Sequence, residues 1–401
     1  HPLVTVRTSP AGLERLRRAG LVGRPLLVDS PFAWLADRYR AARDSFPTRS
    51  GSGIAIDESY KDPAMVERLL AAWSARHGKL VDLVVLGHSR AGRPITALRI
   101  GRDRSGRRPA VLIVAAHHGE ELVSTEIALD AIATLLGERG ETDGGDSADA
   151  PDRLGQWLER LDLWVVPLVN PDGTAAFFER SSLAGRKNGA DSDADGRWAV
   201  TDGVDLNRNY PFRWHTLGEV GSRSDPADAW YRGDRPASEP EVQAIMRLAD
   251  AEHFVAAVSL HTWGTVVLTP YTTDGVVNPD PDVSRELAAA MAKAAPRQTS
   301  GRRFRVRRNI YSVDGVDQDW LLAAHGTAAI LVEAALHNPM NKNLRMRTIA
   351  GTRPTWAALL DRVAAGPTLV GKVVDANGEP VAAVITIDEV KLAANEVWTS
   401  R

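Results

Sequence analysis

The chain has 401 residues, of which 44% are hydrophobic and 25% are charged, the proportions of an ordinary soluble globular protein. Its formal charge of −2 at pH 7 gives no general reason to expect nucleic acid or an anionic membrane as a partner, and no apolar run reaches the ~20 residues of a membrane-spanning helix. Because the chain has no cysteine, disulfides and thiolate ligands are excluded, and a transition metal would have to be bound by His, Asp or Glu.

The N-terminal part of the chain has a helical pattern. LERLRRAGL and FAWLADRYRAARDSF lie within residues 1–50, which run into the polar stretch TRSGSG. We expect residues 1–54 to be either a pro-segment or part of the catalytic fold. The chain begins at His1 rather than at methionine, which is compatible with a removed leader, so we expect a secreted protein. The excess of arginine over lysine indicates a GC-rich genome, and we expect a bacterial source.

Helical and strand patterns follow each other from residue 63 onward. A helix is predicted over 63–77, with Met65, Leu69, Leu70 and Trp73 on its apolar face. LVDLVVLGHS and RPITALRIG then predict a hairpin around a turn at residues 90–92.

The next segments alternate between buried strands and helices. VLIVAA (111–116) is uniformly apolar, as fully buried strands are, and a helix is predicted after it that ends at Gly137 or Gly140. An acidic loop of low complexity, GETDGGDSADAPD, follows at 140–152. The remaining predicted strands are 163–169, 254–261 and 328–333, and the remaining predicted helices are 239–251, 282–295 and 354–364.

This alternation predicts an α/β fold with a mixed, mostly parallel central sheet and helices on both faces. We expect the catalytic domain to span residues 55–365. From about Gly366 the pattern changes to short strands, with a turn at residues 375–378, so a small β module is predicted over 366–401.

The stretch VAAHHGEE (114–121) contains the metal-ligand spacing His-x-x-Glu in two registers. His117 could pair with Glu120, or His118 with Glu121. Ligands of open α/β sheets bind at the carboxyl ends of strands, and this stretch lies between a predicted strand and a predicted helix. Without further motifs, the histidines could equally end the strand and the glutamates could be solvated acids of the first helical turn.

A series of short motifs along the chain resembles the zinc metallocarboxypeptidases of the pancreatic and regulatory type. The resemblance covers residues 55 to 365 and rests on the order and spacing of GHSRAGRPI, HHGEE, VNPDG, RK, GVDLNRNY, SLH, NIY, DW and LVE. The tail GKVVDANGEPVAAV resembles the opening of the transthyretin-like domain of the regulatory subfamily.

The resemblance implies a role for each matching residue. His118, Glu121 and His261 would bind one catalytic Zn²⁺ and leave a fourth position for water, and Asp205 would hold a ligand histidine in place. Glu333 would be the general base for water bound to the zinc, and Arg186 would stabilise the oxyanion. Asn207 and Arg208 would bind the C-terminal carboxylate, over which Tyr311 would close. His117 and Glu120 would be neighbours of the site only.

The implied activity is hydrolysis of the C-terminal peptide bond of peptides and proteins, by a protein that we expect to be a monomer. Gln318 matches the base of the side-chain pocket, and glutamine there is typical of the regulatory subfamily, whose members prefer basic C-terminal residues. Asp274, Asp314 and Asp317 lie close in sequence to pocket-forming segments and would add negative charge. Both observations favour release of Lys or Arg.

A calcium loop is predicted between Arg186 and Arg208. DSDADGRWAVTD (191–202) has the spacing of an acidic Ca²⁺ loop, with Asp191, Asp193, Asp195 and Asp202 as ligands and Gly196 at the sharp turn. A solvated acidic loop explains the same residues equally well.

Two alternatives keep the zinc and change the substrate: cleavage of peptidoglycan stem peptides, and removal of the acyl group of N-acyl amino acids. Retention of Asn207, Arg208 and Tyr311 argues against the second. A non-catalytic binding module is disfavoured because every expected catalytic position is filled.

Overall fold

The structure is a computed structural model, and its first long described segment begins at residue 59. It describes residues 59–139, 150–179, 185–191, 201–298, 301–368 and 373–394, and the shorter pieces 18–19, 194–196, 199, 371, 396 and 398–399. The helical patterns expected within residues 1–54 therefore lie outside the described residues, apart from residues 18 and 19.

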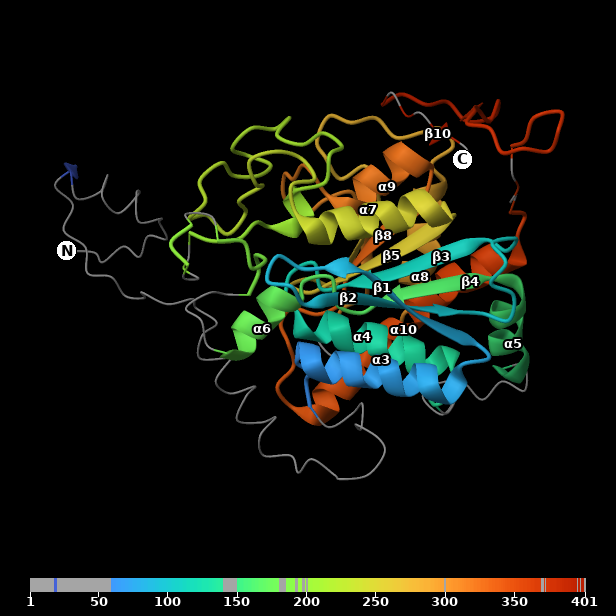
Figure 1. The fold of residues 1–401 in the computed structure, drawn as a ribbon, viewed down its shortest axis with the longest axis horizontal. Coiled ribbons are helices and arrows are strands. Elements are labelled where there is room, and N and C mark those ends of the chain that lie inside the picture. The colour runs from blue at the N-terminus through green and yellow to red at the C-terminus, as the bar shows by residue number, and fades with distance from the viewer. Residues whose placement is uncertain are drawn as a thin grey trace.

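The centre of the molecule is an eight-stranded sheet with the strand order β1-β2-β4-β3-β5-β8-β6-β7 (Figure 1). The neighbours β4, β3, β5 and β8 are parallel, as are β6 and β7, whereas the pairs β1–β2, β2–β4 and β6–β8 are antiparallel. The strands are β1 Val81–His88, β2 Pro94–Ile100, β3 Ala110–Ala115, β4 Asp162–Val166, β5 Ala256–His261, β6 Val266–Leu268, β7 Arg305–Arg307 and β8 Ala328–Glu333.

Helices cover both faces of this sheet (Figure 1). One face carries α3, α4, α5, α8 and α10, and the other carries α7 and α9. The helices are α3 Pro63–His77, α4 Leu122–Leu135, α5 Ala150–Arg160, α6 Pro171–Glu179, α7 Pro240–Glu252, α8 Val283–Ala294, α9 Asp317–His325 and α10 Lys342–Ala365. The predicted mixed α/β fold is confirmed.

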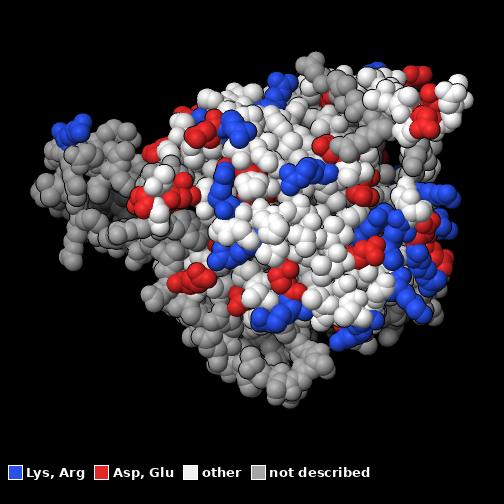
Figure 2. Space-filling model, in the orientation of Figure 1, with Lys and Arg blue, Asp and Glu red and all other residues white. Residues whose placement is uncertain are grey.

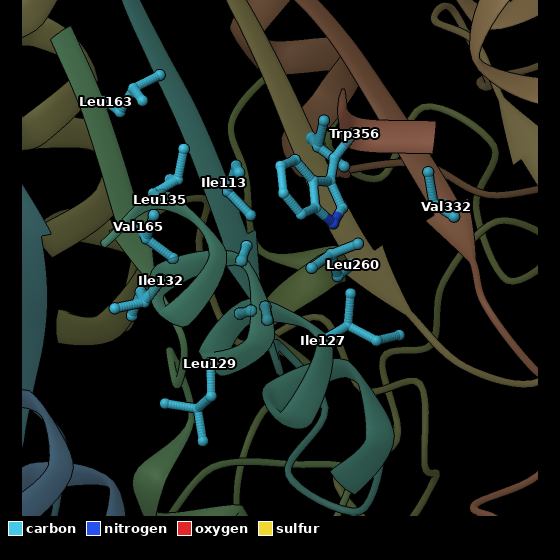
Figure 3. Close-up of a cluster of buried hydrophobic side chains, with 14 of the residues drawn as sticks. Ile113, Ile127, Leu129, Ile132, Leu135, Leu163, Val165, Leu260, Val332 and Trp356 are labelled. Atoms are coloured by element: carbon cyan, nitrogen blue, oxygen red, sulfur yellow. The ribbon is translucent and has the colours of Figure 1, made fainter. Parts of the chain in front are cut away.

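The two faces of the sheet are built by the alternation of side chains along each strand. In β3, Val111 and Ile113 pack toward α4, whereas Leu112 and Val114 pack toward α7 and α9. Figure 3 shows the first of these cores, where Ile113, Val165 and Leu260 from the sheet meet side chains of α4 and Trp356 of α10. Because both faces of the central strands are buried, their sequences are largely apolar.

The predicted helix over 63–77 is confirmed, and its start has an identifiable cause. The side chain of Asp62 accepts a hydrogen bond from the Met65 backbone N–H at 2.8 Å, and Pro63 occupies the first helical turn. Val66, rather than the expected Met65, is buried on the apolar face with Leu69, Leu70 and Trp73.

The last long helix differs from its prediction. α10 begins at Lys342, twelve residues before the predicted start, with the side chain of Asn341 accepting from the Leu344 backbone N–H at 3.1 Å. Pro354 therefore lies inside the helix, where it removes one backbone hydrogen bond. Burial of Trp356, Leu359 and Leu360 in the core offsets this loss.

The C-terminal residues form short strands, β9 Val384–Ile385 and β10 Trp398–Thr399, which pair with each other. The predicted turn is present: Gly378 has a φ of +86°, and its N–H donates to the carbonyl of Asp375 at 3.0 Å. The likeness of this module to a transthyretin-like domain stays a prediction, as do the domain boundaries. Among the described residues, no helix has the length and apolar character needed to cross a membrane.

Charges of both signs are interspersed on the face of the molecule shown in Figure 2. Basic side chains are denser on the right of that view, on the side where α5 lies in Figure 1. Arg102 contacts α5, where it pairs with Glu159 at 3.0 Å, and nearby in the chain Arg104 pairs with Asp82 at 2.6 Å. Exposed pairs of this kind contribute little to stability.

Candidate metal centre and substrate pocket

The carboxyl ends of three neighbouring strands meet at one edge of the sheet, and each is followed by or ends in a residue of the predicted site. His118 follows β3, His261 ends β5 and Glu333 ends β8. In the strand register, Leu260 pairs with Ala115, and His261 pairs with Glu333. The parallel pairing of β3, β5 and β8 therefore brings together residues that are far apart in the sequence.

The turn that carries the first histidine is tightly packed and needs a glycine. Ala116 has a φ of +58°, an unfavourable value for a residue with a Cβ atom. A Cβ added to Gly119 would lie 2.2 Å from the backbone N of Thr174 and 2.3 Å from the backbone C of Gly173. Only glycine fits this approach to the start of α6, which fixes the direction in which His118 leaves β3.

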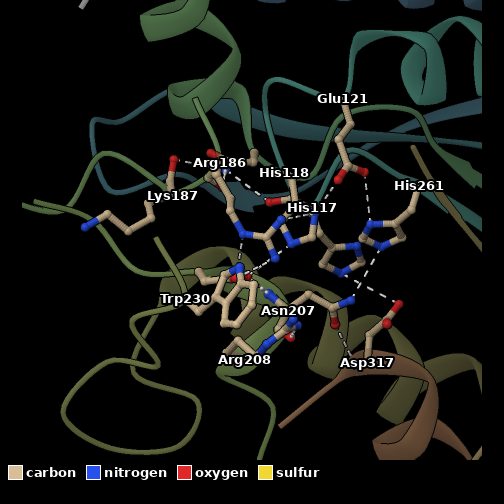
Figure 4. A network of polar contacts seen from close by, with 12 residues as sticks. His117, His118, Glu121, Arg186, Lys187, Asn207, Arg208, Trp230, His261 and Asp317 are labelled. Carbon is tan, nitrogen blue, oxygen red and sulfur yellow. Dashed lines mark hydrogen bonds and ion pairs between the residues drawn. The ribbon is translucent and has the colours of Figure 1, made fainter. Parts of the chain in front are cut away.

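His118, Glu121 and His261 point toward one another (Figure 4). The Nδ1 atom of His118 lies 2.8 Å from Oε1 of Glu121, and Nδ1 of His261 lies 3.1 Å from Oε2 of the same carboxylate. All three side chains are buried, and they are the one group of residues in the described part of the chain that could hold a metal ion.

Asp205 links the first histidine to Arg186. Its Oδ1 lies 3.1 Å from Nε2 of His118, and its Oδ2 accepts a hydrogen bond from Nε of Arg186 at 2.9 Å. Its carboxylate is fully buried, and Arg186 and His118 hold the pKa of Asp205 well below its usual range despite this burial. Because Nε2 of His118 faces Asp205, Nδ1 is the ring atom turned toward Glu121.

Zinc fits this set of donors. A buried carboxylate beside two imidazoles is costly unless a positive charge lies among them. Burial and Arg186 lower the pKa of His118, but Glu121 and Asp205 raise it on balance to about 10, so the surroundings favour positive charge at this place. Two histidines and one glutamate that leave a fourth position are the ligand set of a catalytic rather than a structural zinc.

Glu333 lies in the same pocket without a hydrogen-bond partner for one of its oxygens. Its Oε2 atom is buried and unpaired within the described structure, and burial, reinforced by Glu121, raises its pKa well above the usual value. Gly264 lies against it: a Cβ added there would be 2.7 Å from Cβ of Glu333. A carboxylate held in this way is suited to take up a proton from a reacting group.

Asn207 and Arg208 reach the pocket from the short helical turn η1 (Leu206–Arg208). Asp205 begins this turn and accepts from the Asn207 backbone N–H at 3.0 Å, while Oδ1 of Asn207 accepts from the Asp317 backbone N–H at 2.8 Å. Arg208 Nη2 donates to the hydroxyl of Tyr311 at 3.4 Å. Tyr311 is 44% exposed and lies at the rim of the pocket.

The pocket is partly open to solvent, its empty space including that open part is about 390 Å³, and it is lined mainly by uncharged side chains. Gln318 is among them, at the start of α9, and its Nε2 donates to Oγ1 of Thr272 at 3.3 Å. Besides residues of the metal group and η1, the lining consists of Leu268, Thr272, Asn309, Ile310, Tyr311, Val313, Val316, Gln318, Leu331 and Glu333.

The three aspartates expected to add negative charge lie elsewhere. Asp314 is buried and accepts hydrogen bonds from Ser222 Oγ and the Leu217 backbone N–H, and Asp274 accepts from Asn309 and Ser312. The carboxylate of Asp317 is buried 3.9 Å from Nε2 of His117. None of the three is a lining residue: Asp314 and Asp274 are turned toward their hydrogen-bond donors, and Asp317 is turned toward His117.

His117 is a buried neighbour of the metal group. Its Nε2 lies 2.9 Å from the hydroxyl of Tyr210, and its ring stacks on His261 at a centroid distance of 5.6 Å. Sequence reasoning assigned no role to Tyr210 or Trp230, which lie beside the site, and it expected Asp317 near the side-chain pocket rather than beside His117. Their partners are distant in the chain, so no local pattern points to them.

The predicted calcium loop is only partly described. Asp193 lies outside the described residues. Asp202 is fully buried and accepts from the Ala199 backbone N–H at 2.5 Å, whereas Asp191 is exposed and accepts from the Gly196 backbone N–H at 3.0 Å. In the described part of the loop, Asp191, Asp195 and Asp202 do not form a group that could hold a metal ion, so these residues give the calcium interpretation no support.

Comparison with known proteins identifies the family. The zinc carboxypeptidase family matches residues 66–347. A metallocarboxypeptidase A-like protein of Trichophyton verrucosum is 30% identical over 263 residues, which are 64% of this chain and 57% of the relative. Metallocarboxypeptidase A of Trichophyton tonsurans is 29% identical over 60% of this chain and 55% of its own length. The chain thus spans little more than half the length of these relatives.

Solved structures share the fold. Carboxypeptidase A from Helicoverpa armigera has a TM-score of 0.68 at 22% identity, over 88% of this chain and 86% of its own. Bovine thrombin-activatable fibrinolysis inhibitor, in a complex with tick carboxypeptidase inhibitor, has a TM-score of 0.63 at 20% identity, over 77% of this chain and 98% of its own. Since the family match covers well over half of the residues, the chain belongs to the zinc carboxypeptidase family.

Proposed function

We propose that the protein is a zinc-dependent carboxypeptidase that hydrolyses the C-terminal peptide bond of peptides and proteins. The observation that carries this proposal is the convergence on one pocket of three buried metal-binding side chains, an unpaired buried glutamate and the guanidinium of Arg208. The first two parts suit hydrolysis of an amide, and the third suits a substrate that ends in a carboxylate.

His118, Glu121 and His261 would bind the zinc. When bound, zinc lowers the pKa of a water ligand toward ~7 and polarises the carbonyl oxygen of the scissile bond. Asp205 holds the ring of His118 through Nε2, so that Nδ1 remains available toward Glu121.

Glu333 would move the proton. It would accept a proton from the attacking water and donate it to the leaving nitrogen. This proton transfer needs a group whose charged form is not fully stabilised by its surroundings. The buried Oε2 atom without a partner and the raised pKa of Glu333 agree with this role. Arg186 would stabilise the oxyanion, with its guanidinium oriented by the ion pair to Asp205 at 2.8 Å.

Asn207 and Arg208 would bind the C-terminal carboxylate of the substrate. A guanidinium donates two parallel hydrogen bonds to a carboxylate, and the amide of Asn207 supplies another donor on the same side of the pocket. Tyr311 would close over the bound residue, since its hydroxyl already lies 3.4 Å from Nη2 of Arg208 at the pocket rim.

The expected preference for Lys and Arg is not supported by the lining of the pocket. Glu333 is its only carboxylate outside the metal group among the described lining residues, and Leu268, Val316 and Leu331 provide apolar surface. We propose that uncharged, mainly apolar C-terminal side chains are preferred, with Gln318 as a neutral polar contact. A basic side chain here would lose its hydration, and the one carboxylate in the described lining is Glu333, which the proposed reaction needs for proton transfer.

Mass spectrometry of a peptide mixture tests the proposed function. Stepwise loss of single C-terminal residues that a chelator abolishes and added zinc restores is the expected result. Internal cuts, or no cuts in the presence of zinc, would refute the proposal. A parallel incubation with peptidoglycan stem peptides and N-acyl amino acids tests the alternatives. Faster hydrolysis of either substrate than of the peptide mixture would favour the corresponding alternative.

A further inference from the structure

Residues 391–394, 396 and 398, the last whose side chains the structure describes, pack on the outside of the substrate pocket although they lie beyond the matched range 66–347. We call them the C-terminal segment. At its start, Lys391 and Asp280 exchange two backbone hydrogen bonds of 2.8 and 3.0 Å. Ala394 is buried in a small apolar cluster with Tyr271, Val276 and Leu322. The segment therefore contacts the loop after β6 and the helix α9 together.

A buried hydrogen bond joins the segment to that loop. The hydroxyl of Tyr271 donates to Oε1 of Glu396 at 2.9 Å, and the backbone N–H of Ala394 donates to Oε2 at 2.8 Å. Tyr271 is fully buried, and its ring stacks on Phe212 at a centroid distance of 5.0 Å. Because a carboxylate that is only 7% exposed is costly without donors, these two bonds fix Glu396 and Tyr271 relative to each other.

The second anchor of the segment lies at the end of α9. Nε1 of Trp398 donates to the carbonyl of Leu322 at 3.1 Å. Gly326 ends the helix with a φ of +68°, and a Cβ added there would lie 3.0 Å from the indole ring. The absence of a side chain at Gly326 thus makes room for the indole against the helix end.

The loop and the helix that the segment holds are the elements that build the side-chain pocket. Thr272 follows Tyr271 directly and lines the pocket, as does Gln318 in the first turn of α9. Asp319 accepts hydrogen bonds from the backbone N–H groups of Thr272 and Thr273, at 2.7 and 2.9 Å, and from both hydroxyls. Displacement of Tyr271 would consequently move Thr272 and Gln318.

We propose that Glu396 and Trp398 are positioning residues that set the width of the pocket for the C-terminal side chain, acting through Tyr271 and α9. This inference rests on the proposed carboxypeptidase function and extends it, since it places part of the selectivity outside the family-matched range. None of the described residues of the segment lines the pocket, where the metal group and Glu333 lie, so we expect its effect on substrate binding rather than on the chemical step.

The test uses the full chain and four variants: Tyr271→Phe, Glu396→Gln, the double variant and Trp398→Phe. Val384→Ala serves as the matched control, because Val384 lies in the same module with a side chain that is 66% exposed. Hydrolysis is measured for peptides that differ only in a C-terminal Ala, Leu or Phe. We expect the ratio of kcat/KM for the Phe peptide to kcat/KM for the Ala peptide to change by about 3- to 10-fold, the effect of losing one net hydrogen bond. The change should lie in KM rather than in kcat.

Zinc content should stay the same in all variants, and the double variant should change the ratio by less than the sum of the two single changes, because both substitutions act on the hydrogen bonds of the Glu396 carboxylate. Lower melting temperatures with unchanged ratios would overturn the inference, since they would show a purely structural role. Should Glu396→Gln fail to fold, Tyr271→Phe decides alone. If the unmodified protein cleaves none of the peptides, the proposed function itself fails, which is a different outcome.

Discussion

The indole of Trp230 lies parallel to the phenol ring of Tyr311, with 5.3 Å between the ring centroids and an angle of 5° between the planes. The guanidinium carbon of Arg223 lies 5.1 Å from the Trp230 ring centroid, and that of Arg208 lies 6.0 Å from the Tyr311 ring centroid. Tyr311 is thereby supported above the arginine that we propose as the carboxylate-binding residue, although almost half of its surface is exposed.

Substitution of Trp230 by Ala should weaken substrate binding. An aromatic pair contributes about 0.5–1.5 kcal/mol beyond its buried area, which corresponds to a roughly 2- to 12-fold rise in KM. Steady-state kinetics should show a smaller change in kcat, and Trp230→Phe should restore most of the loss. An unchanged KM in Trp230→Ala would show that Tyr311 needs no support from the indole.

His118→Ala should lose the metal, whereas His117→Ala should keep it. Nδ1 of His118 faces Glu121, but Nε2 of His117 faces the hydroxyl of Tyr210 at 2.9 Å and has no place among the three donors. The measurement is zinc content after dialysis against metal-free buffer. His117→Ala should still lower the melting temperature, because it empties a fully buried position. If His117→Ala lost the metal and His118→Ala kept it, His117 rather than His118 would be the metal ligand.

Glu333→Gln should abolish most activity without loss of stability. Removal of a general base lowers kcat by roughly 10²- to 10⁴-fold. Glutamine also removes a buried charge whose Oε2 atom has no partner in the described structure, so the melting temperature should stay equal or rise. Kinetics, zinc analysis and thermal unfolding of the same preparation check all three expectations. Activity within a few-fold of the unmodified protein would exclude Glu333 as the base.

Glu241, which lies away from the metal group, should make the free energy of unfolding depend on pH. Its Oε1 accepts from the Arg90 backbone N–H at 2.9 Å and its Oε2 from Nδ2 of Asn188 at 3.0 Å, and burial raises its pKa from 4.5 to about 7. The folded state thus binds a proton more tightly than the unfolded state. The stabilisation of the folded state by protonation of Glu241 is complete below pH 4.5 and is lost as the pH rises through about 7.

Glu241→Gln should remove this loss. Relative to the unmodified protein, the variant should gain on the order of 3 kcal/mol in free energy of unfolding between pH 4.5 and 8, the equivalent of the pKa shift. Urea unfolding at several pH values measures the difference. Parallel stability curves for the two proteins would show that another group causes the pH dependence.

Local patterns in the sequence predict the central elements and the residues at their ends. The helix over 63–77 is marked by Asp62, Pro63 and an apolar stripe, and β3 is marked by six apolar residues before His117 and His118. The placement of His118 beside His261 follows from strand order, which the sequence alone does not give. There the order and spacing of the family motifs supplied the missing information.

Contacts between distant segments were not predictable in this way. Tyr210 meets His117 across 93 positions, and Tyr271 meets Glu396 across 125. The early start of α10 was missed because Pro354 is a helix-breaking signal, and only burial of the surrounding helix in the core outweighs it. The three aspartates near the pocket were misplaced since sequence proximity does not determine the direction of a side chain.

Because the donors His118, Glu121 and His261 meet only where β3 and β5 pair, an unfolded chain holds no comparable site. Zinc should then bind the native state alone and stabilise it by about 2.7 kcal/mol at a free concentration one hundred times its dissociation constant. The free zinc concentration would accordingly determine the lifetime of the folded protein as well as the fraction of it that carries the metal. A molecule that loses its zinc would unfold more often and be degraded faster by proteases.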